Sequence, residues 1–371
     1  MKAKNKLSFF DKFIWWLNCM LCFALLISSL ASVIDPRNMW VFAFFGLAYP
    51  YLLLSNLILI VYWLFRDMRY ALFSLVCILL GWNVLFNNLG FHFPRSHSYG
   101  PKLNILRMMT YNVHDFKKYG SKIDASTSHD ILDIITKEQP DIIGIQEFFS
   151  RYHGKYDMRD SLAKIMGTDY FYFEPVMYNN TESIGGAIFS KYPIISRGNI
   201  PNFAERNSEN SCMYIDVQKG DNKFRVYNVH LQSIKFDPED YKFFNQVSGE
   251  SKPELASARR LGSKLRTAFK KRSDQVFKVK QHASNCPYPY IIIGDFNDTP
   301  ASFAVNELSK GLKNAFREKG FGFGRTYNGD FPNFQIDYIM TSQQFDVLDY
   351  YIIEKKLSDH YPVRSDVLLS P

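Results

Sequence analysis

The sequence lacks several features that would place it in a specialised class of protein. Only 5 of its 371 residues are cysteines, and three of these lie in apolar runs, which excludes a disulfide-stapled scaffold. The chain has no internal repeat, no low-complexity tract and neither of the phosphate-binding patterns GxGxxG and GxxxxGK(S/T), so we expect no nucleotide cofactor. Intrinsic disorder is also excluded, because 47% of the residues are hydrophobic and 16% aromatic, against 22% charged.

The chain also lacks a strong excess of basic residues over most of its length. The first 100 residues carry a surplus of five positive charges, whereas residues 101–371 carry a surplus of only three. Dedicated nucleic-acid-binding domains carry a basic patch or stripe. The balance therefore argues against nucleic acid as the substrate without excluding it, since clusters such as Lys270-Lys271-Arg272 can contact phosphates.

Charged residues are absent from three long stretches near the N-terminus, at 13–34, 38–65 and 70–94. A helix needs about 20 mostly apolar residues to cross a bilayer. We therefore predict three transmembrane helices, at about 13–34, 40–64 and 70–90, within a membrane region formed by residues 1–97. Pro50 is compatible with a span, because neighbouring helices can satisfy the freed carbonyl. A signal peptide followed by core helices is the alternative, but it does not explain three runs in succession.

Loop charges predict the orientation of these spans, because lysine and arginine favour the cytoplasmic side. Four lysines precede the first span, Arg37 lies between the first two, and Arg66 and Arg69 lie between the second and third. We therefore expect an integral membrane protein with its N-terminus in the cytoplasm. After three crossings, the C-terminal part is expected outside the cytoplasm. The charges that oppose this orientation are Arg95, Lys102 and Arg107.

Beyond residue 104 the pattern changes to short β-rich runs separated by polar turns. Strands are predicted over 105–113, 141–148, 185–190, 224–231, 290–296 and 334–340. Helices are predicted over 128–138 with Ser128 as N-cap, over 158–166, and over 253–283, where apolar residues recur every three or four positions. This mixture indicates one α/β domain, residues 98–371, with two sheets inside and helices outside.

Acidic, amide and imidazole side chains occur at or near the ends of these strands, where a rigid scaffold presents reactive groups. Taken singly, most have a structural explanation, such as a turn asparagine or a core histidine. Asp337 is harder to explain, because a carboxylate inside an apolar strand needs a partner. We interpret the set as one site, since all the structural explanations would otherwise have to hold together. Its members are Asn112, Glu147, His230, Asp295, Asn297, Asp337, Asp359 and His360.

The segments around these residues resemble the endonuclease/exonuclease/phosphatase superfamily, which includes pancreatic deoxyribonuclease, abasic-site endonucleases, neutral sphingomyelinases and inositol-polyphosphate 5-phosphatases. The resemblance implies a four-layered α/β fold and hydrolysis of a phosphate ester with Mg²⁺ or Mn²⁺. The matching segments follow the family's order and span nearly all of 104–368. They are TYNVHDF (110–116), IIGIQEF (142–148), GGAIFSKYPI (185–194), YNVHLQS (227–233), IIIGDFNDTP (291–300), IDYIM (336–340) and LSDHYPV (357–363).

The resemblance implies a metal site, and a hard divalent cation takes oxygen ligands from one or two carboxylates and from water. Glu147 is the first choice as ligand and Asp359 the second, with Asn112 holding either the metal site or a phosphate oxygen. The motif position of Asp295 implies that it orients or activates the attacking water, and that of Asn297 that it donates to the developing charge.

The two histidines receive roles from the same resemblance. His360 is expected to contact the phosphoryl oxygens, with its tautomer fixed by Asp337 as in other hydrolases. His230 is expected to stabilise the pentavalent state or to protonate the leaving oxygen. Some family members give this histidine a carboxylate partner, for which Glu182 is a weak candidate.

The leading hypothesis is thus a membrane-anchored, metal-dependent phosphodiesterase or phosphatase acting on nucleic acid or on phospholipid headgroups. The histidine in YNVHLQS is similar to the deoxyribonuclease and sphingomyelinase branches, and GDFNDTP departs from the GDLNYR of inositol phosphatases. A non-catalytic scaffold on the same fold is the alternative, but it predicts broken motifs, and every motif position is filled. A transport role for the spans is disfavoured because they carry no charge.

Overall fold

In the computed structural model, the residues described are 7–93, 105–117, 125–154, 156–205, 208–234, 237, 239–240, 255–329 and 332–369. The chain forms two compact units. The first comprises residues up to Asn88 together with 299–307, and the second comprises Leu89–Asp298 and Leu308–Pro371. The predicted domain boundary after residue 97 lies outside the described residues and stays a prediction.

Among the described residues, two helices of the first unit are long and apolar enough to cross a membrane. They are α1 (Phe9–Leu30) and α4 (Tyr49–Arg66). The third predicted span is interrupted, because α5 (Met68–Leu80) and α6 (Trp82–Asn88) meet at a bend of 75°. Gly81 stands at the bend, where a Cβ atom would lie 2.6 Å from Ser29 Oγ of α1. Of the three predicted transmembrane helices, two are therefore present as continuous candidate spans, and the third is replaced by a bent pair of helices.

The second predicted span, over 40–64, is also divided. A short α2 (Pro36–Met39) is followed by α3 (Val41–Leu47), and α4 begins only at Tyr49. Pro50 lies in the first turn of α4, where a helix makes no use of the missing N–H. The proline therefore begins the span, contrary to the expectation that it lies inside it.

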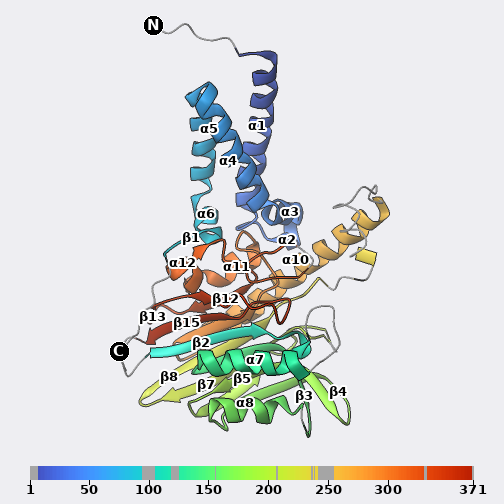
Figure 1. The fold of residues 1–371 in the computed structure, drawn as a ribbon, viewed down its shortest axis with the longest axis vertical. Helices are drawn as coiled ribbons and strands as arrows, with labels where there is room; N and C mark the ends of the chain where they lie inside the picture. Colours follow the sequence, from blue (N-terminus) through green and yellow to red (C-terminus); the bar gives the residue numbers. More distant parts are fainter. Residues whose placement is uncertain are drawn as a thin grey trace. The chain divides into compact units, whose positions relative to one another are not determined.

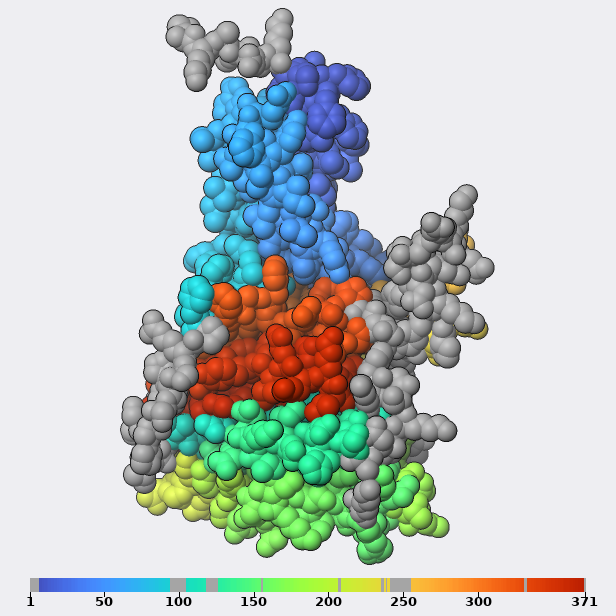
Figure 2. All heavy atoms as spheres, in the orientation of Figure 1, coloured from blue at the N-terminus to red at the C-terminus, as the bar shows by residue number. Residues whose placement is uncertain are grey.

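The long helices pack around a small polar cluster and expose an apolar outer surface. Asn18 and Cys22 of α1, Asn56 of α4 and Ser74 of α5 are each at most 1% exposed. Cys22 Sγ donates to Asn56 Oδ1 at 3.1 Å, and Ser74 Oγ donates to Asn18 Oδ1 at 2.9 Å. The outer surface, drawn in blue in Figure 2, carries many exposed leucine, phenylalanine and tryptophan side chains. Polar groups inside and apolar groups outside are the arrangement that suits contact with lipid.

The second unit is built on two mixed sheets (Figure 1). The six-stranded sheet contains, in spatial order, β10 (Lys313–Asn314), β12 (Asp337–Thr341), β9 (Tyr290–Asp295), β8 (Asn222–His230), β7 (Ser211–Lys219) and β6 (Ile194–Asn199). The other contains β13 (Phe345–Val347), β15 (Val363–Leu369), β2 (Ile105–Asn112), β3 (Ile142–Arg151), β5 (Glu182–Ser190) and β4 (Phe171–Tyr178), and β14 (Tyr351–Ile352) pairs with β15. A separate two-stranded ribbon pairs β1 (Gly90–Phe91) with β11 (Phe321–Gly322).

Alternation along the strands divides the core into layers, because successive side chains of a strand point to opposite faces. In β2, Leu106 and Met108 join the cluster between the two sheets, whereas Met109 and Tyr111 pack under α7 (Ala125–Glu138) and α8 (Met158–Met166). On the outer face of the six-stranded sheet lies α10 (Leu255–Ser284), where His282 Nδ1 is 2.9 Å from the Tyr227 hydroxyl of β8. The predicted sandwich of two sheets flanked by helices is confirmed.

The shorter helices are α11 (Phe303–Ser309), α12 (Ala315–Lys319) and the 3₁₀ turn η1 (His114–Phe116). All six predicted strands are present within a few residues, and α8 has the predicted bounds. Ser128 is not the N-cap of α7, because the helix already includes residues 125–127. Residues 253 and 254, predicted as the start of α10, lie outside the described residues. The strands that were not predicted are β4, β6, β7, β10, β13, β14 and β15 of the two sheets and both strands of the ribbon, β1 and β11.

Candidate active site

Strand pairing alone brings three of the predicted site residues side by side. In the six-stranded sheet, Asp295 at the end of β9 is paired with His230 at the end of β8 and with Asp337 at the start of β12. Gly294 precedes Asp295 with a φ of +142°, and a Cβ atom there would overlap the Val229 carbonyl. Only glycine adopts this conformation without strain, so GDFN lets β9 lie close to β8 just before Asp295.

A β-bulge directs Glu147 of the other sheet into the same place. The pairing of β3 with β5 shifts between Ile145 and Phe148, and Glu147 has a φ of +51°. In an unbroken strand, Glu147 would share the face of Ile143 and Ile145, which pack under α7 and α8. The bulge turns its carboxylate to the site instead, a common use of bulges near active sites.

Asn112, the last residue of β2, links the carboxylates of the two sheets. Its Nδ2 donates to Glu147 Oε1 and to Asp295 Oδ2, both at 3.1 Å. Its Oδ1 accepts the His114 backbone N–H at 3.1 Å. The amide therefore fixes the distance between the two acids.

His360 lies between two aspartates. Its Nδ1 is 2.9 Å from Asp337 Oδ2, and its Nε2 is 3.6 Å from Asp295 Oδ2. Asp337 is fully buried and His360 is 4% exposed. A buried carboxylate in this position accepts the Nδ1–H and holds Nε2 toward the reacting groups.

The turn after β9 places Asn297 against Asp295. The Asn297 backbone N–H donates to Asp295 Oδ1 at 2.8 Å, and its Nδ2 donates to Asp295 Oδ2 and to the Leu231 carbonyl, each at 3.1 Å. Asn297 has a φ of +52°, a conformation that asparagine tolerates better than most residues. In this arrangement Asn297 positions Asp295.

His230 has a partner on one ring nitrogen only, among the residues that the structure describes. Its Nδ1 lies 3.1 Å from the Glu209 carbonyl, which can only accept, so Nδ1 carries a proton. Its Nε2 is buried without a hydrogen bond, 3.6 Å from Asp295 Oδ2 and 3.8 Å from Glu147 Oε1. The expectation that Glu182 supports His230 is wrong, because the Glu182 carboxylate contacts Arg151 and a backbone carbonyl fills that role.

The remaining metal-ligand candidate, Asp359, faces a histidine that the sequence analysis did not single out. His114 Nδ1 lies 3.4 Å from Glu147 Oε2 and 3.7 Å from Asp359 Oδ1. His114, Asp115 and Phe116 all have φ between +45° and +58°, a strained run for residues other than glycine. The position of His114 two residues after Asn112 was the available signal in the sequence.

The groups of the site have displaced pKa values with identifiable causes. Burial raises the pKa of Asp295 to about 6, which Asp337 reinforces and His360 opposes. Burial acts against the charged form of His360, but Asp337 and Asp295 raise its pKa well above the usual 6.5. Burial also opposes ionisation of Glu147, yet the hydrogen bond from His114 and the charges of His230 and His114 lower its pKa to about 2. At neutral pH the same site therefore holds an ionised Glu147 and a protonated His360.

The donor set of the site suits a hard divalent cation. Glu147 and Asp359 are 19% and 15% exposed, so both can share a cation with water and substrate. Asp295, Asp337 and His360 also bring three ligand atoms within 4.8 Å of one another. That second group is buried, and its imidazole is already hydrogen-bonded. The partly exposed carboxylates of Glu147 and Asp359 therefore fit the cation better than the buried group does.

Helix α10 contacts the loops that follow His230 and Asp295. Gln275 Oε1 accepts the backbone N–H of Gln232, just after His230, at 2.8 Å. The Arg272 guanidinium is 1% exposed, with its Nε 3.3 Å from Asp298 Oδ2 in the loop after Asp295. The sequence did not predict the roles of Gln275 and Arg272, because no pattern in an amphipathic helix distinguishes a residue that contacts a loop from an ordinary polar residue of its surface.

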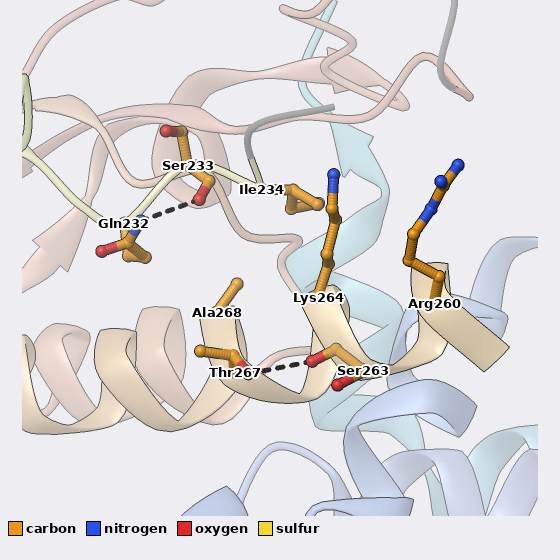
Figure 3. A pocket seen from close by; sticks show the side chains of 8 residues that line it. All are labelled: Gln232, Ser233, Ile234, Arg260, Ser263, Lys264, Thr267 and Ala268. Atoms are coloured by element: carbon orange, nitrogen blue, oxygen red, sulfur yellow. Dashed lines mark hydrogen bonds between the residues drawn. The ribbon is translucent and has the colours of Figure 1, made fainter. Parts of the chain in front are cut away.

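A pocket of about 340 Å³ lies between α10 and the loop that follows His230 (Figure 3). Its walls combine hydroxyl and amide groups with the side chains of Lys264 and Arg260, which extend from α10 toward the loop. Both cations are ion-paired with Asp240, and Arg260 also pairs with Glu239 and Lys264 with Asp237, so acidic groups offset their positive charge. The structure thus brings all eight predicted residues together, and this pocket follows His230 along the chain.

Family models match both parts of the chain. Residues 82–360 match the endonuclease/exonuclease/phosphatase family, and residues 11–88 match a domain of unknown function. No curated protein matches the chain.

Solved structures resemble the second unit at low sequence identity. An endonuclease/exonuclease/phosphatase from Beutenbergia cavernae is 20% identical with a TM-score of 0.50, over 72% of each chain. A family protein from Leptotrichia buccalis is 15% identical with a TM-score of 0.50, over 71% of this chain and 99% of its own. The human Nocturnin catalytic domain with bound sulfate is 15% identical with a TM-score of 0.50, over 72% of this chain and 95% of its own. These similarities establish the fold.

Proposed function

Because the chain belongs to the endonuclease/exonuclease/phosphatase family, we propose that it is a membrane-anchored, divalent-metal-dependent phosphodiesterase. The observation that carries the proposal is the linked set Asp337–His360–Asp295–Asn112–Glu147, in which side chains from both sheets converge within hydrogen-bonding or near-contact distances. A scaffold that had lost catalysis would have no need to keep this buried set of charges, which is costly without a function.

Glu147 and Asp359 would hold Mg²⁺ or Mn²⁺, with Asn112 completing or positioning this site. The cation, when bound, supplies positive charge to the phosphate oxygens and is worth several kcal/mol of transition-state stabilisation. The Asn112 amide N–H groups donate to the carboxylates of Glu147 and Asp295, so the observed contacts of Asn112 hold these two side chains in place.

The protein groups would divide the remaining chemistry. Asp295 orients the attacking water and accepts its proton, and Asn297 fixes the carboxylate that does so. Protonated His360 donates from Nε2 to a phosphoryl oxygen, since Asp337 occupies Nδ1. His230 keeps its proton on Nδ1 while neutral, so protonation of its free Nε2 would let it donate to the leaving oxygen.

The first unit would anchor the enzyme in a membrane. Trp15, Trp63 and Tyr70 cluster with centroid separations of 4.4–6.2 Å near the Asp11–Arg66 ion pair, at one end of the helices. Trp40 and Trp82, each stacked edge-on with a phenylalanine, belong to the segments beyond the other end. Aromatic residues at both ends of apolar helices are typical of the two membrane interfaces.

The side on which the catalytic unit lies depends on the bent pair α5–α6. Helix α5 begins beside Trp15 and ends at Gly81, beside Ser29 in the last turns of α1. It therefore runs along about 14 residues of α1, or roughly 21 Å, before α6 continues. We propose that this pair completes a third crossing and places the catalytic unit outside the cytoplasm. A reporter enzyme fused after Pro371 tests the orientation, and activity confined to the cytoplasm would contradict it.

The activity is tested by p-nitrophenol release from bis-p-nitrophenyl phosphate by the full chain in detergent, with Mg²⁺ or Mn²⁺ and with EDTA. We expect metal-dependent turnover that Asp295→Asn abolishes. Calorimetric metal titration of the same samples covers the case of a slow artificial substrate. A folded protein that neither turns over nor binds either metal would contradict the proposal.

A further inference from the structure

The two-stranded ribbon of the second unit exposes an unusual number of aromatic side chains. We call residues 90–93 and 320–324, which include β1 and β11, the phenylalanine ribbon. Phe91, Phe93, Phe321 and Phe323 are 54%, 74%, 50% and 59% exposed. The rings of Phe93 and Phe321 lie 4.7 Å apart, so the side chains form a patch. Soluble surfaces seldom carry such contiguous aromatic groups without a binding function.

Glycines make this outward orientation obligatory. They alternate with the phenylalanines in the sequence GFGFG over 320–324, and the inward-facing Gly320 and Gly324 are buried. A Cβ atom at either glycine would overlap the Phe316 ring of α12, and Gly324 has a φ of +59°. The backbone at Gly320 and Gly324 therefore packs directly on α12, which leaves no space there for a side chain. The alternation directs glycines toward the protein and phenylalanines away from it, which is the reverse of the arrangement expected for a ribbon exposed to water.

Basic residues border the ribbon. Arg317 and Arg325 are exposed, and Lys319 is half-buried, against the single acid Glu318 in the same stretch. A surface that combines aromatic rings with basic side chains suits the interface of a bilayer with anionic lipids.

The chain connects the ribbon to both the candidate spans and the active site. Helix α6 ends at Asn88 and β1 begins at Gly90, so the ribbon starts within about 7 Å of that helix end along the chain. At the other side, Gly324 precedes Thr326, whose Oγ1 accepts the Asp337 backbone N–H at 3.0 Å, and Tyr327, which forms a β-bridge with His360.

We propose that the phenylalanine ribbon inserts into the interface of the membrane that holds the first unit. It thereby holds the active site at the height of lipid headgroups, so the substrate class it selects is a lipid phosphodiester; this last step rests on the proposed function. A ribbon covered by a second copy or by another protein is the competing outcome that the experiment separates.

The full chain in proteoliposomes containing anionic lipid tests the insertion. A nitroxide label is attached at Phe321→Cys in a Cys286→Ser background, and the background without Phe321→Cys corrects for the native cysteines, of which Cys212 is 1% exposed. Tyr178→Cys, at a 74% exposed aromatic residue of β4, is the matched control. We expect the Phe321 label to collide preferentially with oxygen and the Tyr178 label with a water-soluble nickel chelate. A Phe321 label that collides like the control, or one shielded from both reagents, would overturn the proposal.

Activity provides a second readout. The double variant Phe321→Ser/Phe323→Ser should hydrolyse soluble bis-p-nitrophenyl phosphate at the native rate but a vesicle-embedded lipid phosphodiester about tenfold more slowly. Equal losses on both substrates would overturn the positioning role. Because the label reports without catalysis, an inactive protein with an inserted label would contradict the proposed function alone. An active protein with a water-exposed label would contradict the insertion alone.

Discussion

Replacing Asp337 by asparagine tests the core of the catalytic arrangement. The fully buried Asp337 carboxylate is the partner of His360 Nδ1, and it is a principal reason that the pKa of His360 lies well above 6.5. In Asp337→Asn the imidazole loses this charge while remaining buried, so its pKa should fall and it should lose its proton near neutrality. Asp295 also loses its cationic neighbour, one of the groups that oppose the rise of its pKa. We therefore expect both the acid and the base to be in the wrong protonation state.

The magnitude follows from comparable carboxylate–histidine pairs. Losing the orienting charge costs about 1,000-fold or more in kcat, which corresponds to about 4 kcal/mol of transition-state stabilisation. The free energy of unfolding should fall by only about 1–2 kcal/mol, because the amide keeps one hydrogen bond to the ring. The assay is kcat for bis-p-nitrophenyl phosphate beside denaturant unfolding.

Asp216→Asn is the matched control. Asp216 makes a buried bidentate pair with Arg225, at 2.5 and 2.8 Å, in the same sheet as His230. It lies five residues along β7 from Ser211, the partner of His230, or about 17 Å away. We expect it to cost about 3–5 kcal/mol of stability and to leave kcat unchanged. The reasoning is refuted if Asp337→Asn keeps more than about one-tenth of native kcat, or if the control loses as much.

Three further outcomes are expected. Burial raises the pKa of Asp295 to about 6, so kcat/KM should rise with pH as this carboxylate becomes ionised. It should fall again at high pH as His360 loses its proton, and a flat profile from about pH 4.5 to 9 would contradict these roles. Glu147→Gln should weaken Mg²⁺ binding in calorimetry and lower kcat by about 100-fold or more, and EDTA should inactivate the native protein reversibly. A variant with unchanged metal affinity would show that Glu147 is not a ligand. Burial raises the pKa of Asp349 from 3.8 to about 6, so between these pH values the folded state binds more protons than the unfolded state, and stability should decrease as pH rises. Asp349→Asn should therefore raise Tm at pH 8 and not at pH 4. Equal Tm shifts at the two pH values would oppose this account.

Sequence patterns were enough to predict the mixed α/β fold and to name the eight residues that the structure brings together. Hydrophobic periodicity located the main strands and α8, because alternation and amphipathic spacing are imposed by local geometry. The motif residues at strand ends identified the site, since parallel neighbours such as β8 and β9 must end at one edge of a sheet. The apolar content of the N-terminal part likewise identified the candidate spans.

The arrangement of these parts depends on packing between segments that are far apart in the chain. Hydropathy could not reveal the bend at Gly81, where the backbone lies against Ser29 of another helix. The turn of Glu147 into the site depends on a bulge against β5, and the partner of His230 is the Glu209 carbonyl rather than Glu182. The sequence does not encode such contacts as patterns, because they join residues far apart in the chain through backbone groups that every residue carries. The residues could therefore be named from the sequence, whereas their geometry follows from packing.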